Sequence, residues 1–392
     1  MKFSDGFWEQ FNEKKVVCYG ADATGMAFIY YAEKTGIKIA YFVDRSKEKQ
    51  RIKMLGLDVK DPFDLMYENA DDLKIVITAP VGRDAILRTL QGMGFILGKQ
   101  IVDQYLIDRF GEDNSCIDAM LGLSRGENII YKHKACRNLE DSKVIMISGG
   151  STTDPCYLAD VPSWTFYLQE LLDRDNISAQ IINIAEKGYT SAQELLSLIR
   201  EGISEMPDIF ISYSGYNDIA TANDIKDGKH YEYTSRNIVL TFDKLLNNIR
   251  KEEKFPDIYM GKLDNKFGSQ YIVNMRIMNA ICKEFSCQFI GILQPSLLTI
   301  PRELMQSDFA KRVADDVSVQ ENRKRWMEVY RNYKEELKKY SYLYDFTNIL
   351  NENDDVFEDV CHVNESGNRI IAQKVFELLK REQCFDTDDG IR

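Results

Sequence analysis

Apolar residues near the start of the chain gather in short uninterrupted runs, and segments with helical spacing follow them. The runs KKVVCYG (14 to 20), IKIAYFVD (37 to 44) and LKIVITAP (73 to 80) predict buried strands. MAFIYYAEK and RDAILRTLQGMGF have the spacing of amphipathic helices. Strands that alternate with helices are typical of a parallel sheet covered on both faces. We therefore expect a first, doubly wound α/β domain over residues 1–112.

The same alternation returns after a region of mixed pattern, residues 113–141, which we interpret as a connecting region with one helix. The chain then predicts strands at SKVIMIS (142 to 148), AQIINIA (179 to 185), PDIFISYSG (207 to 215), CQFIGILQP (287 to 295) and YLYDFTNI (342 to 349). Helical spacing appears at WTFYLQELLD, SAQELLSLIR and VNESGNRIIAQKVFELLKR. We expect a second three-layer α/β/α domain over residues 142–384.

The pattern loosens between residues 220 and 285, inside the second predicted domain. It begins with a polar insertion, KDGKHYEYTSRN, and continues into NIVLTFDKLLNNIRK, which is amphipathic. QYIVNMRIMNAICKEF then predicts a helix before the sheet resumes. The role of this insertion is open.

Composition and charge narrow the choice of partners. The 392 residues carry a formal net charge of −12, which disfavours binding to nucleic acid or to an anionic membrane surface. The chain shows neither a secretory signal pattern nor an apolar run long enough to span a membrane. We expect a soluble, cytoplasmic protein, and its oligomeric state is open.

The cysteines and histidines give no sign of a metal or a disulfide framework. Eight cysteines are scattered without CxxC pairs, so we expect them to be reduced. The three histidines, His133, His230 and His362, lack the spacing of a helical zinc pair. We therefore predict that the protein holds no metal and needs no cofactor.

Polar and small residues follow the strands of the second predicted domain, where ligand sites of open α/β sheets collect. Two glycines precede Ser151 and permit a tight turn that presents this serine at the start of a helix, although an ordinary N-cap serine has the same pattern. The loops after the next two strands offer a backbone N–H at Gly188 and the amide of Asn217. Such donors suit a developing oxyanion, but each is also compatible with a plain polar loop.

A carboxylate and a histidine lie three residues apart just before the last helix, in Asp359-Val360-Cys361-His362. Across such a turn, Asp359 can accept from Nδ1 of His362 and leave Nε2 free to take a proton from a serine. A surface or capping histidine is the alternative. His362 is, however, the histidine that the pattern places at a strand end of this domain.

Together, GGST after the first strand, NIAEKGYTS after the second, GYND after the third and DVCHVNESGNRIIA before the last helix resemble the SGNH hydrolases, also called the GDSL esterase family. The resemblance covers roughly residues 141 to 380 and implies a flavodoxin-like fold. It further implies Ser151 as nucleophile, His362 as base and Asp359 as the orienting acid. Backbone N–H groups of Ser151 and Gly188 and the Asn217 amide would form the oxyanion hole.

The chain departs from that family at one position. The family usually has an aspartate before the serine, and Gly150 stands there, which leaves local loop geometry and substrate preference open. Asp154 and Asp218 are compatible with either a structural role or contact with substrate.

The first predicted domain carries a partial dinucleotide fingerprint. Gly20 and Gly25 lie between a strand and a helix, and Asp44 ends the next strand, as a Rossmann-like fold would place them. Asp22 occupies the position of the middle glycine, where its carboxylate would repel a pyrophosphate. NAD binding at Gly20, Gly25 and Asp44 is therefore the less favoured interpretation.

The first domain also loosely resembles small Rossmann-like modules attached to bacterial enzymes that modify surface polysaccharides, through FVDRS and GLDVKDPFDL. That resemblance implies an acylated sugar, sugar nucleotide or glycan precursor made in the cytoplasm as substrate. The main hypothesis is an ester hydrolase that removes a short acyl group from a substrate such as an O-acetyl carbohydrate. The alternatives are an O-acyltransferase with the same acyl-enzyme, an NAD-dependent oxidoreductase and a non-catalytic scaffold.

Overall fold

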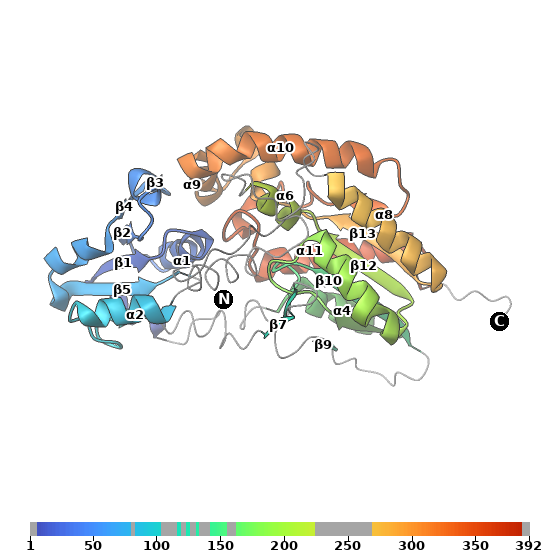
Figure 1. Ribbon diagram of the computed structural model, residues 1–392, viewed down its shortest axis with the longest axis horizontal. Coiled ribbons are helices and arrows are strands. Elements are labelled where there is room, and N and C mark those ends of the chain that lie inside the picture. Colours follow the sequence, from blue (N-terminus) through green and yellow to red (C-terminus); the bar gives the residue numbers. More distant parts are fainter. Residues whose placement is uncertain are drawn as a thin grey trace, which may run out of the picture.

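The computed structural model describes residues 6–79, 83–102, 116–118, 123–125, 131–132, 142–154, 162–223 and 269–385. Several predicted features lie outside these residues. They are the polar insertion and the amphipathic segment between 226 and 251, both predicted domain boundaries, and His133 and His230. The two six-stranded sheets of the described residues lie at opposite ends of the view in Figure 1.

The first sheet has six strands in the order β3-β4-β2-β1-β5-β6. The strands are β1 (Lys15–Tyr19), β2 (Ile39–Val43), β3 (Lys53–Met54), β4 (Leu57–Lys60), β5 (Leu73–Ile77) and β6 (Ile101–Val102), and the helices are α1 (Ala23–Lys34) and α2 (Arg83–Gly92). All pairings are parallel except β3 with β4. The crossovers β1-α1-β2 and β5-α2-β6 run in opposite directions from the centre, so right-handed connections place α1 and α2 on opposite faces. The predicted strands and helices of this part are therefore confirmed as a doubly wound sheet.

The second sheet has the order β14-β13-β12-β10-β11-β9. Its strands are β9 (Tyr131–Lys132), β10 (Lys143–Gly149), β11 (Ala179–Asn183), β12 (Ile209–Ser214), β13 (Gln288–Leu293) and β14 (Leu343–Asp345). Five strands are parallel, and β9 pairs antiparallel at the edge. All five strands predicted for this part form, in the doubly wound order 2-1-3-4-5.

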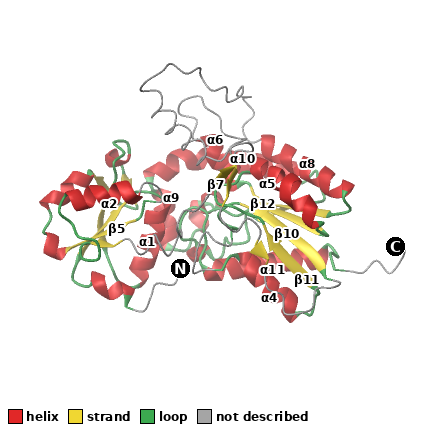
Figure 2. Cartoon of the chain, turned by 60° about the horizontal axis from the view of Figure 1, so that its bottom comes forward, coloured by secondary structure: helices red, strands yellow, loops and turns green. Residues whose placement is uncertain are grey.

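Helices cover both faces of the second sheet (Figure 2). The helices of this part of the chain are α4 (Trp164–Arg174), α5 (Ser191–Ser197), α6 (Tyr216–Asn223), α8 (Ser269–Glu284), α9 (Asp308–Asp315), α10 (Val317–Leu337) and α11 (Glu365–Arg381). Figure 2 places α4 and α11 on one face and α5 and α8 on the other. The central strands are almost free of solvent, as a parallel sheet between two helical layers requires, and Ile145, Ile181 and Ile211 are 0% exposed.

In the connecting region, the described residues form the short strands β7 (Cys116–Asp118), β8 (Leu123–Arg125) and β9. The first two pair as an antiparallel ribbon, and β9 adds to the second sheet. These strands do not test the helix expected for this region, because most of residues 113–141 lie outside the described part of the chain. The helices α9 and α10 were not predicted, and α10 runs along the top of Figure 1. Among the described residues, no helix combines the length and apolar character needed to cross a bilayer.

Candidate active site

The candidate site lies at the point where the strand order of the second sheet reverses. From β10 the chain moves first to its neighbour β11 and then crosses back to β12 on the other side. Gly149 at the end of β10 pairs with Tyr213 of β12, and Ile147 pairs with Asn183 at the end of β11. The carboxyl ends of these strands are thus level, and their loops meet in the crevice where open α/β sheets bind ligands.

Ser151 stands in a tight turn directly after β10. The N–H groups of Thr153 and Asp154 both donate to the carbonyl of Gly150, at 2.9 and 3.0 Å, which closes the turn behind the serine. Buried Trp164 donates from Nε1 to the Thr153 hydroxyl at 3.2 Å and ties the turn to α4. The serine is therefore presented from a braced loop rather than from a free one.

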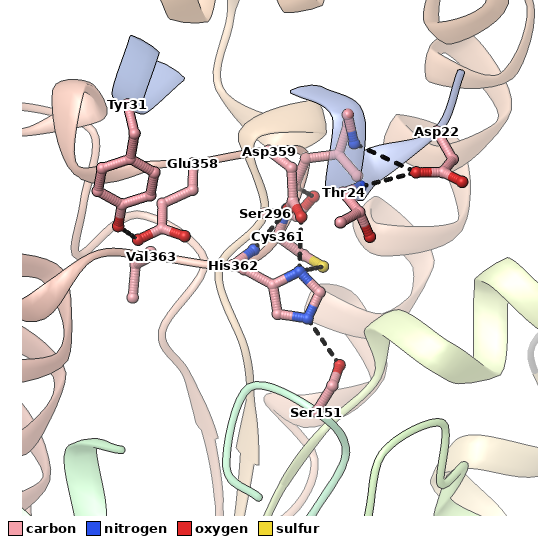
Figure 3. A network of polar contacts seen from close by, with 12 residues as sticks. Asp22, Thr24, Tyr31, Ser151, Ser296, Glu358, Asp359, Cys361, His362 and Val363 are labelled. Atoms are coloured by element: carbon pink, nitrogen blue, oxygen red, sulfur yellow. Dashed lines mark hydrogen bonds and ion pairs between the residues drawn. The ribbon is translucent and has the colours of Figure 1, made fainter. Parts of the chain in front are cut away.

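Ser151, His362 and Asp359 form a continuous chain of hydrogen bonds (Figure 3). His362 Nε2 lies 2.8 Å from Ser151 Oγ, and its Nδ1 lies 2.7 Å from Asp359 Oδ2. The other carboxylate oxygen, Oδ1, accepts the backbone N–H of Cys361 at 2.8 Å and of His362 at 2.7 Å. Asp359 thus fixes both the ring and the backbone of His362.

The environment keeps Asp359 ionised. Its side chain is fully buried, and burial by itself acts to raise the carboxyl pKa. The charge and hydrogen bond of His362, together with the two backbone N–H groups, outweigh burial and hold the pKa of Asp359 below its ordinary value. An ionised partner at Nδ1 favours the tautomer whose Nε2 can accept a proton.

Two backbone donors near Ser151 have no acceptor among the described residues. These are the N–H groups of Ser151 itself and of Gly188, which has a φ of +79°. The Asn217 amide donates one hydrogen from Nδ2 to the carbonyl of Tyr189 at 2.8 Å, which leaves its second hydrogen for another acceptor. The three groups named from the sequence therefore offer the donors that an oxyanion needs.

The structure gives a steric reason for Gly150, which stands where the SGNH hydrolases usually have an aspartate. A Cβ at Gly150 would lie 2.3 Å from Nδ2 of Asn217 and 3.4 Å from the carbonyl oxygen of Tyr189. The first distance is far below van der Waals contact, so any side chain at position 150 must displace the Asn217 amide. Glycine at position 150 therefore leaves the Asn217 amide in place.

Three buried polar side chains hold the loops together, and for two of them, Asp154 and Asp218, the sequence left open a structural role or contact with substrate. Asp154 accepts the Lys187 N–H at 3.0 Å, beside Gly188. Asp218 accepts the N–H and hydroxyl of Ser191, and Asn183 donates to the carbonyl of Thr153 at 2.8 Å. Burial raises the pKa of Asp218 to about 6. The signal for these positions in the sequence was a charged or amide residue near the end of an apolar strand.

A small cavity opens beside the nucleophile. Its volume is about 20 Å³, little more than the roughly 10–15 Å³ that one water requires. It is lined by Ser151, Thr152, Asp154, Ser163, Tyr213, Cys361, His362, Val363, Asn368 and Ile371. The cavity has room for a group of about the size of a methyl.

One group of potential metal ligands lies in the described part of the chain. Oxygen of Asp359, Sγ of Cys361 and a ring nitrogen of His362 are within 4.8 Å of one another. Nδ1 of His362 is already engaged by Asp359 at hydrogen-bond distance, which is shorter than two ligands of one tetrahedral zinc ion would stand apart. The arrangement fits a hydrogen-bonded pair better than a metal centre.

The residues named for NAD binding meet at the carboxyl ends of β1 and β2, but internal contacts occupy them. Asp22 caps α1 by accepting from the N–H groups of Thr24 and Gly25, at 3.0 and 3.2 Å. Its carboxylate thus stands where a pyrophosphate would bind, and burial raises its pKa to about 6. Asp44 accepts from the N–H of Ala21 at 3.0 Å and from Lys49.

Packing explains both glycines of this turn. A Cβ at Gly20 would lie 2.5 Å from the backbone nitrogen of Ala79, and one at Gly25 would lie 2.6 Å from the carbonyl oxygen of Gly20. The close approach of α1 to the sheet therefore accounts for the fingerprint without a dinucleotide.

No protein-family model and no curated protein matches the chain. Solved structures similar to it include acetylxylan esterase Axe2 of Geobacillus stearothermophilus, at 14% identity and a TM-score of 0.37, over 61% of this chain and 94% of that one. A Bacteroides fragilis protein provisionally described as an acylhydrolase has 12% identity and a TM-score of 0.38, over 62% and 89%. LAE5, an α/β hydrolase from the metagenome of Lake Arreo in Spain, has 14% identity and a TM-score of 0.37, over 64% and 100%. At this distance the activity of this chain has to be derived from the site itself.

Proposed function

We propose that the protein is a serine-dependent ester hydrolase of the SGNH type. The observation that carries this proposal is the chain of hydrogen bonds from Ser151 Oγ to His362 Nε2, at 2.8 Å, and from Nδ1 to buried Asp359, at 2.7 Å. A serine, a neutral imidazole and an orienting carboxylate in this order are what nucleophilic acyl transfer requires.

In the proposed reaction, Ser151 Oγ attacks the carbonyl carbon of an ester while His362 Nε2 takes the hydroxyl proton. The tetrahedral intermediate collapses as the imidazolium gives this proton to the departing alkoxide, which leaves an acyl-serine. Water then attacks the acyl-serine with His362 again as base, and the carboxylic acid is released. Asp359 stays ionised throughout and stabilises the imidazolium.

The oxyanion of both intermediates would be bound by the N–H groups of Ser151 and Gly188 and by the free amide hydrogen of Asn217. These donors are fixed before the reaction, because the three loops that carry them are tied together by buried and partly buried hydrogen bonds. Donors that need no reorganisation give most of the rate enhancement in reactions of this type.

The acyl group is proposed to be acetyl. The cavity of about 20 Å³ beside Ser151 has room for a group of about the size of a methyl, which suits a short acyl group. The alcohol is proposed to be a carbohydrate hydroxyl, an expectation that comes from the sequence resemblance of the first 110 residues to modules of polysaccharide-modifying enzymes.

The test is release of p-nitrophenol from p-nitrophenyl acetate by wild type, Ser151→Ala and His362→Ala. We expect wild-type turnover and a loss of at least about a thousandfold in both variants. A matched control is Ser286→Ala, which removes a serine hydroxyl in the turn after α8, well outside the cavity. Equal activity in wild type and Ser151→Ala would contradict the proposal.

An acyltransferase would share the acyl-enzyme and differ in the acceptor. Mass spectrometry can measure how the acyl group is divided between water and the hydroxyl groups of an added sugar. This division separates the two reactions. Exclusive formation of the acylated sugar would replace hydrolysis by transfer with the same residues.

A further inference from the structure

A helix of the first sheet packs directly against the loop that carries Asp359 and His362. We refer to residues 354–364 as the His362 loop. The helix is α1, and its contacts with this loop come from two adjacent tyrosines, Tyr30 and Tyr31. More than 300 residues of chain separate the two partners, so the contact is a product of the fold.

The hydroxyl of Tyr30 bridges the two ends of the His362 loop. It donates to the carbonyl of Asp355 at 2.7 Å and accepts from Nδ2 of Asn364 at 2.8 Å. Asn364 also caps α11, because its Oδ1 accepts the N–H of Gly367 at 3.1 Å. A single hydroxyl on α1 thus fixes the start of the loop relative to the helix that follows it.

The hydroxyl of Tyr31 reaches the interior of the same loop, where it hydrogen-bonds to Oε1 of Glu358 (Figure 3). Glu358 is 0% exposed and directly precedes Asp359. Its backbone N–H donates to the carbonyl of His362 at 2.9 Å. Its other carboxyl oxygen has no partner in the described part of the chain. Tyr31 therefore supplies the polar contact of a buried carboxyl on the residue that directly precedes Asp359.

Further contacts hold α1 in this position. Arg312 of α9 pairs with Glu33 of α1, with Nη1 at 2.8 Å from Oε1. The ring of Tyr30 packs edge to face against Phe309, with centroids 5.1 Å apart. These contacts tie α1 to α9.

We propose that α1 is a positioning element of the active site and that Tyr30 and Tyr31 hold the His362 loop in the geometry that aligns Asp359, His362 and Ser151. The proposal rests on the proposed esterase function for its kinetic consequence. It gives the first sheet a role in catalysis that needs no bound nucleotide.

The chemistry of Glu358 is consistent with this role. Burial, with a smaller contribution from the charge of Asp359, raises the pKa of Glu358 to about 8. A carboxyl that stays protonated near neutral pH adds no second negative charge beside Asp359. Removing its hydrogen-bond partner leaves a buried polar group unsatisfied, which destabilises this local geometry in particular.

The test compares Tyr31→Phe and the double variant Tyr30→Phe/Tyr31→Phe with a matched control, Tyr41→Phe. Tyr41 of β2 makes the same kind of contact, from its hydroxyl to Glu68 at 2.8 Å, but lies away from the His362 loop. We expect kcat for p-nitrophenyl acetate to fall about tenfold in Tyr31→Phe and about a hundredfold in the double variant, with KM within about twofold. Tyr41→Phe should keep wild-type kcat.

A second readout does not depend on turnover. The proton shared by Asp359 and Nδ1 of His362 is expected to give a far-downfield proton NMR signal, which Asp359→Asn identifies by its loss. We expect this signal to be kept in Tyr41→Phe and to be lost or broadened in Tyr31→Phe. We expect Glu358→Ala to lose activity and Glu358→Gln, which retains a hydrogen-bonding group, to keep most of it.

Wild-type kcat in Tyr31→Phe and in the double variant, with the downfield signal intact, would overturn the proposal. If wild type itself hydrolyses no ester, the proposed function fails, and the NMR comparison still decides whether α1 positions His362. If the double variant does not fold, the single variants Tyr30→Phe and Tyr31→Phe, together with Glu358→Gln and Glu358→Ala, give the same comparison.

Discussion

A methyl group added at Gly150 should disable the Asn217 amide without touching Ser151 or His362. The Cβ of Gly150→Ala would come within 2.3 Å of Nδ2 of Asn217, whereas carbon and nitrogen normally approach to about 3.5 Å. The amide must therefore move by roughly 1 Å. This movement also breaks its 2.8 Å hydrogen bond to the carbonyl of Tyr189.

The magnitude follows from the loss of one oxyanion donor. Such a loss costs about 10²–10³ in kcat, or about 3–4 kcal/mol of transition-state stabilisation. We expect Gly150→Ala to lose that amount of kcat for p-nitrophenyl acetate, and Asn217→Ala to lose a similar amount. The substitution Gly150→Asp should be at least as damaging, because it adds the same Cβ and a charge.

A double-mutant cycle makes the reasoning specific. In an Asn217→Ala background the amide is already absent, so adding Gly150→Ala should cost little more, and the two effects should be strongly non-additive. The control is Gly92→Ala, because no atom lies within 4 Å of a Cβ at that position. Retention of kcat within about threefold by Gly150→Ala, or full additivity of the two substitutions, would refute the reasoning.

Three further predictions follow from buried groups. Ile371→Ala enlarges the cavity beside Ser151 and should raise the butyrate-to-acetate ratio of kcat/KM at least about tenfold, whereas Val375→Ala, buried on the same helix but outside the lining, should leave the ratio unchanged. Burial raises the pKa of Glu194 from 4.5 to about 8, so the folded state holds a proton that the unfolded state releases above pH 4.5. The melting temperature should therefore fall as the pH rises from 5 to 8. The substitution Glu194→Gln should weaken that fall. A pH-independent difference between the two proteins would contradict this assignment. Asp22 blocks the N-terminus of α1, so an NADH fluorescence titration should show no saturable binding, and saturation would restore the dinucleotide hypothesis.

Hydrophobic patterning predicts the strands because strands of a parallel sheet are buried on both faces and form continuous apolar runs. The run 142 to 148 and its successors therefore correspond closely to β10 through β14. The helix α10 was not predicted, although its buried residues Trp326, Tyr330, Tyr333 and Leu337 have helical spacing. The strands β7, β8 and β9 were missed because two or three residues are too short for any periodicity.

For the candidate site, the sequence predicted that reactive residues lie at strand ends, but it did not predict how close these residues are to one another. Ser151 and His362 stand 211 positions apart, and only the level ends of the strands and the long return through α9 and α10 bring them together. The function of Gly150 could not be anticipated, since its steric demand comes from Asn217 on another loop. The role of α1 was hidden for the same reason, because nothing in Tyr30 and Tyr31 marks a contact with a distant loop.

The central claim is that Ser151 is a nucleophile activated by His362. Its most direct test is incubation with a fluorophosphonate, followed by intact-mass measurement and peptide mapping of wild type, Ser151→Ala and His362→Ala. We predict a single adduct on Ser151 in wild type, no adduct in Ser151→Ala and labelling slowed by orders of magnitude in His362→Ala. Absence of an adduct on wild-type Ser151, or equal labelling rates with and without His362, would contradict the account.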